Sequence, residues 1–166
     1  LKNDSCLGSM FEGCTLLKST GKLPRVQLVP RWGMEYMFRN CTGLQYDDDL
    51  TAITLNGENP YRAMFMGCTS LKVAPKIAGV LKSASSMFSG CTSLTEAPYL
   101  RLDPDYAISG LFFCCTSLSK VQCNITTWKD SYYSNNWLRN VAATGVFICP
   151  ASLDTTTRDA SHVPEG

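Results

Sequence analysis

The sequence lacks most of the features that mark catalytic proteins. It contains one histidine, His162, in a polar tail, and no serine or cysteine is placed with it by any motif of nucleophilic catalysis. The nucleotide-binding phrases G-x-x-x-x-G-K-S/T and G-x-G-x-x-G and the metalloprotease phrase H-E-x-x-H are absent. We therefore predict a non-enzymatic protein, with no catalytic residues, no metal ligands and no cofactor.

The sequence also lacks an excess of charge and long apolar runs. Its formal charge is +1, with lysine and arginine scattered among the acidic residues, so there is no basic stripe and nucleic acid is not expected as a partner. No apolar run approaches the ~18 residues of a membrane span. The 166 residues suffice for one domain with a sizeable core, and no linker indicates a second domain.

The sequence does contain a phrase that recurs as MFEGCTLL, MFRNCTGL, MFMGCTSL, MFSGCTSL and LFFCCTSL. The cysteines shared by these copies are Cys14, Cys41, Cys68, Cys91 and Cys115. Successive copies are 27, 27, 23 and 24 residues apart. A degenerate sixth copy, WLRNVAAT, places Val141 at the cysteine position. Self-similarity at such a period is the signature of a repeat solenoid, and six copies exceed the ~3 that a stable stack requires.

Each copy continues into a second pattern, L-x-x-φ, where φ is a small or branched apolar residue, as in Leu71-Lys-Val-Ala. Apolar residues on both sides of a polar pair suit a short strand or a turn at the corner of a coil. The M-F-x-G-C segment predicts one helical or 3₁₀ turn. The predicted fold is a single-domain, leucine-rich-repeat-like solenoid, an α/β stack of right-handed coils with short parallel strands. We assign the coils to residues 1–136, and a degenerate sixth repeat with a C-terminal cap to residues 137–166.

The recurring cysteine is predicted to serve packing, because Val141 occupies the same position and free cysteine behaves as a small hydrophobic residue. Parallel side chains hold stacked cysteines beyond disulfide geometry, and structural zinc ligands usually come in closely spaced pairs. The phenylalanines recur at their own register and are assigned to the core as well. The predicted repeat core comprises Phe11, Cys14, Phe38, Cys41, Phe65, Cys68, Phe88, Cys91, Cys115 and Val141.

Two further cysteines, Cys123 and Cys149, follow aligned positions of the last two coils by five residues. We therefore expect them to be neighbours. A disulfide between them is one alternative and two free thiols are the other, because disulfide geometry is demanding.

The two x positions of L-x-x-φ should point outward, while the residues on both sides of them point inward. Stacked copies would align these positions in two rows, which form the face that solenoids generally use for binding. The candidate binding face drawn from these rows comprises Lys18, Tyr46, Lys72, Val73, Glu96 and Lys120. Its alternative is a solubilising strip without a ligand.

The phrase M-F-x-G-C-T-S-L followed by x-x-A-P resembles the BspA-like leucine-rich-repeat surface proteins of anaerobic gut and oral bacteria, and the closing NNWLRNVAATGVF resembles the C-terminal segment of that group. The resemblance covers nearly the whole chain. It implies a secreted or cell-surface adhesion module whose partner is a host or neighbouring-cell protein, or a glycan.

Two other hypotheses stay open: a structural spacer within a larger surface protein, and an enzyme, which ranks last. The chain begins at Leu1 without a charged-then-apolar leader, so a secretory signal is either absent or already removed. We expect the chain to be a piece of a longer extracellular protein.

Overall fold

The structure is a computed structural model that describes residues 4–21, 27–28, 31–45, 54–55, 59–77 and 79–163, with backbone only for residues 27–28, 54–55 and 104. Regular secondary structure is sparse in these residues. The strands are β1 (Gln27–Leu28), β2 (Thr54–Leu55), β3 (Leu81–Ser83), β4 (Leu102–Ala107), β5 (Lys120–Gln122) and β6 (Val146–Ile148). The one helix assigned among the described residues, α1, spans Ser131–Ser134.

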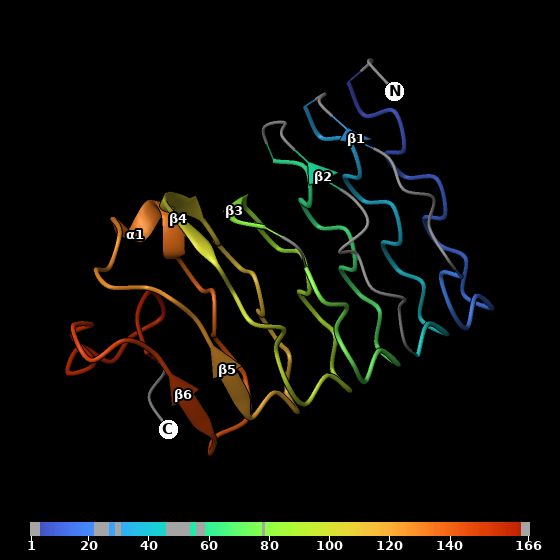
Figure 1. The fold of residues 1–166 in the computed structure, drawn as a ribbon. Helices are drawn as coiled ribbons and strands as arrows, with labels where there is room; N and C mark the ends of the chain where they lie inside the picture. Colours follow the sequence, from blue (N-terminus) through green and yellow to red (C-terminus); the bar gives the residue numbers. More distant parts are fainter. Residues whose placement is uncertain are drawn as a thin grey trace.

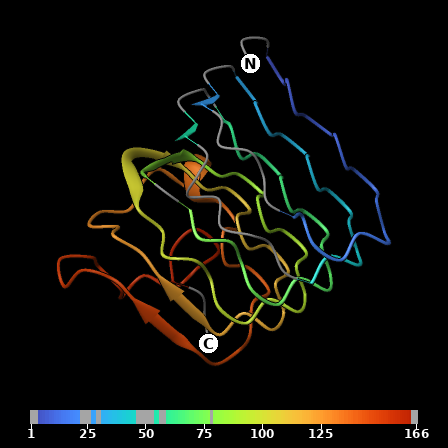
Figure 2. The same ribbon diagram turned by 45° about the vertical axis from the view of Figure 1, so that its right-hand side comes forward.

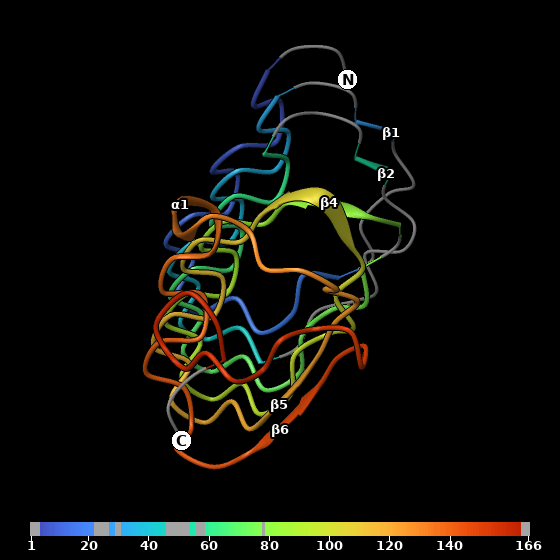
Figure 3. The ribbon, with the colours of Figure 1, turned by 90° about the vertical axis from the view of Figure 1, so that its left-hand side faces the viewer.

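The strands pair in parallel as β1 with β2, β3 with β4, and β5 with β6. In each pair the partners lie about one repeat apart in the sequence, as for Lys120 of β5 and Val146 of β6. Parallel strands must be joined by a long crossover connection. Here the rest of the repeat forms that connection. Figure 1 shows the result: the chain runs from its N-terminal to its C-terminal end as successive coils lying side by side. The coils largely overlap when the molecule is turned by 90° (Figure 3).

The M-F-x-G-C segments form linked turns, and the predicted helical turn is wrong for them. In the second coil, the Met37 N–H donates to the Met34 carbonyl at 3.2 Å, which closes a turn of four residues. A left-handed φ then recurs at every fourth residue, at Trp32 (52°), Tyr36 (57°) and Asn40 (60°). Because a right-handed helix needs a negative φ at each residue, no helix continues through these positions.

The alternate N–H groups of these turn segments join each coil to the next. The Phe38 N–H donates to the Met64 carbonyl at 2.9 Å, and the Asn40 N–H donates to the Met66 carbonyl at 2.7 Å. The bond of Phe38 recurs from Phe11 to Met37 (2.9 Å), Phe65 to Met87 (2.9 Å), Phe88 to Leu111 (3.0 Å) and Phe112 to Trp137 (2.8 Å). Buried backbone groups are thereby satisfied without a helix or a continuous sheet.

A column of stacked phenylalanine rings runs through the core. Neighbouring rings in the series Phe11, Phe38, Phe65, Phe88 and Phe112 have centroids 5.4–5.6 Å apart and planes within 9° of parallel. All of them except the half-buried Phe11 are fully buried. Offset stacking of this kind adds about 0.5–1.5 kcal/mol per pair beyond the burial of area.

A column of cysteines lies beside the phenylalanines, and each of its thiols donates to the phenylalanine carbonyl of the preceding coil. The bonds are Cys41 to Phe11 (3.0 Å), Cys68 to Phe38 (3.1 Å), Cys91 to Phe65 (3.1 Å) and Cys115 to Phe88 (3.0 Å). Burial raises the pKa of the Cys115 thiol to about 12 and that of Cys91 well above its usual range. These thiols therefore stay protonated at neutral pH, as weak donors within the core.

Three predicted core positions, Phe11, Cys14 and Val141, are less buried than the rest of their columns, and each lies in a terminal coil. Cys14 is exposed, which corrects its assignment to the core, because among the described residues no coil lies on the N-terminal side of the first coil. Val141 is half-buried, since it lies in the last coil at the edge of a cavity. Core burial therefore needs a neighbouring part of the chain, a coil or the C-terminal tail, on both sides of a coil.

Candidate binding face

The L-x-x-φ segments place their residues as the pattern requires in the third, fourth and fifth coils. The leucines Leu71, Leu94 and Leu118 are buried. The residues that follow them, Lys72, Thr95 and Ser119, are exposed. An apolar residue on each inward side anchors the segment, so the polar pair faces outward.

The outward residues of these three coils are neighbours. Val73 forms a parallel bridge with Glu96, and Glu96 forms one with Lys120 at the start of β5. The Lys120 Nζ atom also lies 2.6 Å from Glu96 Oε1, in an ion pair whose two side chains are about half exposed. Exposed ion pairs contribute little to stability, but this one fixes a positive and a negative group side by side.

Lys72 and Lys18 belong to the same row, although they lie two coils apart. The Gln45 N–H donates to the Lys18 carbonyl at 3.1 Å, and the Lys72 N–H donates to the Gln45 carbonyl at 3.0 Å. Both lysine side chains are exposed. Tyr46, the remaining residue of the candidate binding face, lies outside the described residues.

A shallow hollow of about 290 Å³ occupies the centre of this face. Its lining includes the predicted residues Lys72, Val73 and Glu96, together with Pro98 and Tyr99. Val73 is 64% exposed and Tyr99 is 50% exposed. The hollow therefore combines an apolar strip with a lysine and a carboxylate, which suits a ligand of mixed character.

Tyr99 is not among the residues that the L-x-x-φ pattern selects from the sequence. It directly follows the A-P that ends the L-x-x-φ segment of the fourth coil. This position could have predicted the role of Tyr99, because a residue directly after the closing proline lies at the edge of the outward face.

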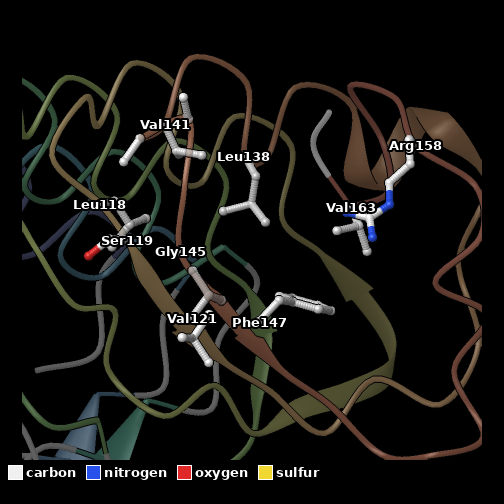
Figure 4. A pocket seen from close by; sticks show the side chains of 12 residues that line it. Leu118, Ser119, Val121, Leu138, Val141, Gly145, Phe147, Arg158 and Val163 are labelled. Atoms are coloured by element: carbon white, nitrogen blue, oxygen red, sulfur yellow. The ribbon is translucent and has the colours of Figure 1, made fainter. Parts of the chain in front are cut away.

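A second cavity of about 120 Å³ lies at the C-terminal end of the stack and is mainly apolar. Figure 4 shows Leu138 and Val141 on one side of it, with Val121 and Phe147 facing them and Arg158 beside Val163. In the sixth copy Leu138 stands where earlier coils carry phenylalanine, and Val141 stands at the cysteine position. A leucine side chain is smaller than a phenylalanine ring, so it leaves space where the aromatic column ends.

We predict that Leu138→Phe stabilises the protein by about 1 kcal/mol, because the added ring continues the column and fills this cavity. Urea denaturation measures the effect. Leu94→Phe is the matched control: Leu94 is fully buried in the closely packed part of the stack, where overpacking costs about 1–3 kcal/mol. Equal destabilisation by both substitutions would show that the ring does not enter the cavity.

The remaining candidates from the sequence do not gather into a site. Cys123 and Cys149 are both free in the structure, and their coils are joined by a bond from the Cys123 N–H to the Ile148 carbonyl (3.0 Å). His162 pairs with Asp159 at 2.7 Å in the tail. Within the described ranges no three histidine, cysteine or acidic side chains cluster in a way that could hold a metal.

Comparison with family models, with curated proteins and with solved structures finds no match for this chain. In the part of the chain that the structure describes, no helix has the length and apolar character needed to cross a membrane.

Proposed function

We propose that the chain is a leucine-rich-repeat-type solenoid of right-handed coils that acts as a binding module rather than as an enzyme. Two observations support the architecture: parallel strand pairs that join successive repeats, and a hydrogen bond from each phenylalanine of the column to the following coil. Such a stack is rigid in advance of binding, so association loses little conformational entropy.

The observation that carries the proposal is the hollow in which the outward residues of successive coils meet. Val73 and Tyr99 expose apolar surface there, and the ion pair of Glu96 and Lys120 lies next to them. A tyrosine ring offers a stacking surface and a hydroxyl to a sugar or a protein, and its side chain loses little entropy when it is fixed. The neighbouring charges would orient the ligand.

The partner in this proposal is a host or neighbouring-cell protein or a glycan, and the location is the bacterial cell surface or the extracellular medium. Both follow from the resemblance of the repeated phrase to BspA-like surface proteins. Nucleic acid is not proposed, because the charge on the face is mixed in sign.

A structural spacer is the second candidate function, and a separate cluster favours it. The guanidinium carbons of Arg39 and Arg62 lie 4.4 Å and 5.6 Å from the centre of the Tyr36 ring. Arg39 pairs with Glu12 of the preceding coil, and Arg62 pairs with Glu35 of the preceding coil. These contacts tie three coils together away from the binding face, which would stiffen a stack whether or not it carries a ligand.

The test measures binding of the purified protein to arrayed host matrix proteins and glycans by biolayer interferometry. We expect the double substitution Val73→Lys and Tyr99→Ala to weaken binding by at least tenfold, about 1.4 kcal/mol, as for residues at the centre of an interface. Tyr132→Ala is the control, because Tyr132 is an exposed tyrosine of α1 outside the hollow. Binding that survives the double substitution would place the ligand elsewhere, and a wild-type protein that binds nothing on the arrays would favour the spacer.

A further inference from the structure

The two ends of the stack differ in how their apolar residues are covered. In the first coil, Met10 is 60% exposed and Leu16 is 86% exposed, whereas Met37, at the position of Met10 in the second coil, is buried. At the other end Trp137 and Leu138 are buried. The C-terminal tail covers them there, and the Trp137 Nε1–H donates to the His162 carbonyl at 2.8 Å. In Figure 2 the first coil forms the outer edge of the stack at its N-terminal end.

The first coil also has backbone carbonyl groups on the same side that accept no hydrogen bond from another described coil. In the second coil, the carbonyls of Glu35 and Met37 accept the N–H groups of Ser9 and Phe11, each at 2.9 Å. The corresponding carbonyls one repeat earlier belong to Gly8 and Met10, and no donor from another coil reaches them among the described residues. The turn segment of the first coil therefore presents a row of acceptors at this edge.

Two side chains of the first coil, Cys14 and Phe11, lack the contacts that their equivalents in the second coil make with the preceding coil. The Cys41 thiol donates to the Phe11 carbonyl, but the Cys14 thiol, at the same position one coil earlier, is exposed. Phe11 stacks on Phe38 and is half-buried, whereas Phe38 is stacked on both of its faces. A further coil with the phrase M-F-x-G-C would supply both missing partners. Its phenylalanine carbonyl would accept the Cys14 thiol, and its phenylalanine ring would stack on Phe11.

A second copy of the chain does not meet these requirements. Two first coils placed face to face would bring carbonyls against carbonyls, and buried acceptors without donors are destabilising. A second copy docked through its C-terminal end would have to displace the tail that covers Trp137 and Leu138. The partner must instead bring its own row of N–H donors.

We propose that the N-terminal edge is a docking surface for one further coil of this repeat type. The docked coil donates alternate N–H groups to the carbonyls of Gly8 and Met10, as the first coil does to the second. Its phenylalanine ring stacks on Phe11, and its phenylalanine carbonyl accepts the Cys14 thiol. The exposed side chains of Met10 and Leu16 become the apolar part of the contact.

The test is a tandem duplication of residues 4–30, inserted before residue 4, with both cysteines of the added copy replaced by serine. The added segment has the 27-residue length of the first repeat. We expect pulsed alkylation with iodoacetamide, followed by peptide mass spectrometry, to show Cys14 modified at least tenfold more slowly than in the unextended protein. The duplicated protein should remain monomeric.

The matched control is the same duplication with Phe11→Asp in the added copy, which cannot stack on the column and should leave Cys14 as reactive as in the unextended protein. Unchanged Cys14 reactivity in the first duplication overturns the proposal. The proposal also fails if Cys14 of the unextended protein becomes protected with rising protein concentration as a dimer forms, because a second copy would then be the occupant. Neither result depends on the ligand of the binding face.

Discussion

Phe65→Ala is expected to lower the free energy of unfolding by about 3–5 kcal/mol, the range found when a fully buried phenylalanine is truncated. Phe65 lies in the middle of the column, with its ring centroid 5.5 Å from those of both Phe38 and Phe88. The substitution leaves a cavity and removes two stacked pairs at once. Urea denaturation under reducing conditions measures the loss.

Phe11→Ala is the internal control for this experiment. Phe11 is half-buried and stacks on Phe38 from the end of the column, so its truncation should cost less than half as much. Phe65→Leu, which imitates Leu138 of the sixth copy, should fall between the two. If Phe65→Ala costs no more than Phe11→Ala, the stacked column contributes little to the stability of the fold.

Loss of stability at alkaline pH is the second large effect that we expect. Burial raises the pKa of Cys115 to about 12 and that of Cys91 well above its usual range, whereas an exposed thiol in the unfolded chain has a pKa of ~8.5. Below that pH both states are protonated and the stability contribution is complete. Above it only the unfolded state ionises, so each buried thiol lowers the free energy of unfolding by about 1.4 kcal/mol per pH unit.

For Cys91 and Cys115 together the expected loss is roughly 5 kcal/mol at pH 10.5, relative to pH 8. Urea denaturation across this range measures it, and the double substitution Cys91→Val and Cys115→Val is the comparison, since it removes both titrating groups. Val141 occupies the equivalent position of the sixth copy, which makes valine the natural replacement. Parallel pH profiles for the two proteins would contradict the burial of these thiols as the cause.

The sequence predicted much of the candidate site because the L-x-x-φ pattern places two outward residues between two inward apolar ones, and the burial of the third and fourth coils follows that pattern. Val73, Glu96 and Lys120 were selected in this way, and the structure brings them together through parallel bridges. Tyr99 follows the segment and falls outside the L-x-x-φ pattern. Tyr99 lines the hollow together with Lys72 and Val73 of the neighbouring coil. Its position there depends on how the two coils stack, which the sequence of one repeat does not determine.

The linked turns could not be predicted from the residues that form them. Tyr36, Ala63 and Ser86 adopt left-handed φ values of 57°, 49° and 57°, which non-glycine residues ordinarily avoid. Local propensity would place these residues in a helix or a strand. The hydrogen bonds from alternate N–H groups to the next coil offset the strain, and those bonds exist only once the coils have stacked.

The sequence by itself determined the period of the repeat, the registers of the phenylalanine and cysteine columns, and the side of each segment that faces outward. These follow from the order of apolar and polar residues along one chain. Only the tertiary structure decided that the M-F-x-G-C segments are turns, that Cys14 is exposed while its equivalents are buried, and that Tyr99 completes a hollow. Each of these depends on the neighbouring coil, because the burial of a repeat is shared with the repeats next to it.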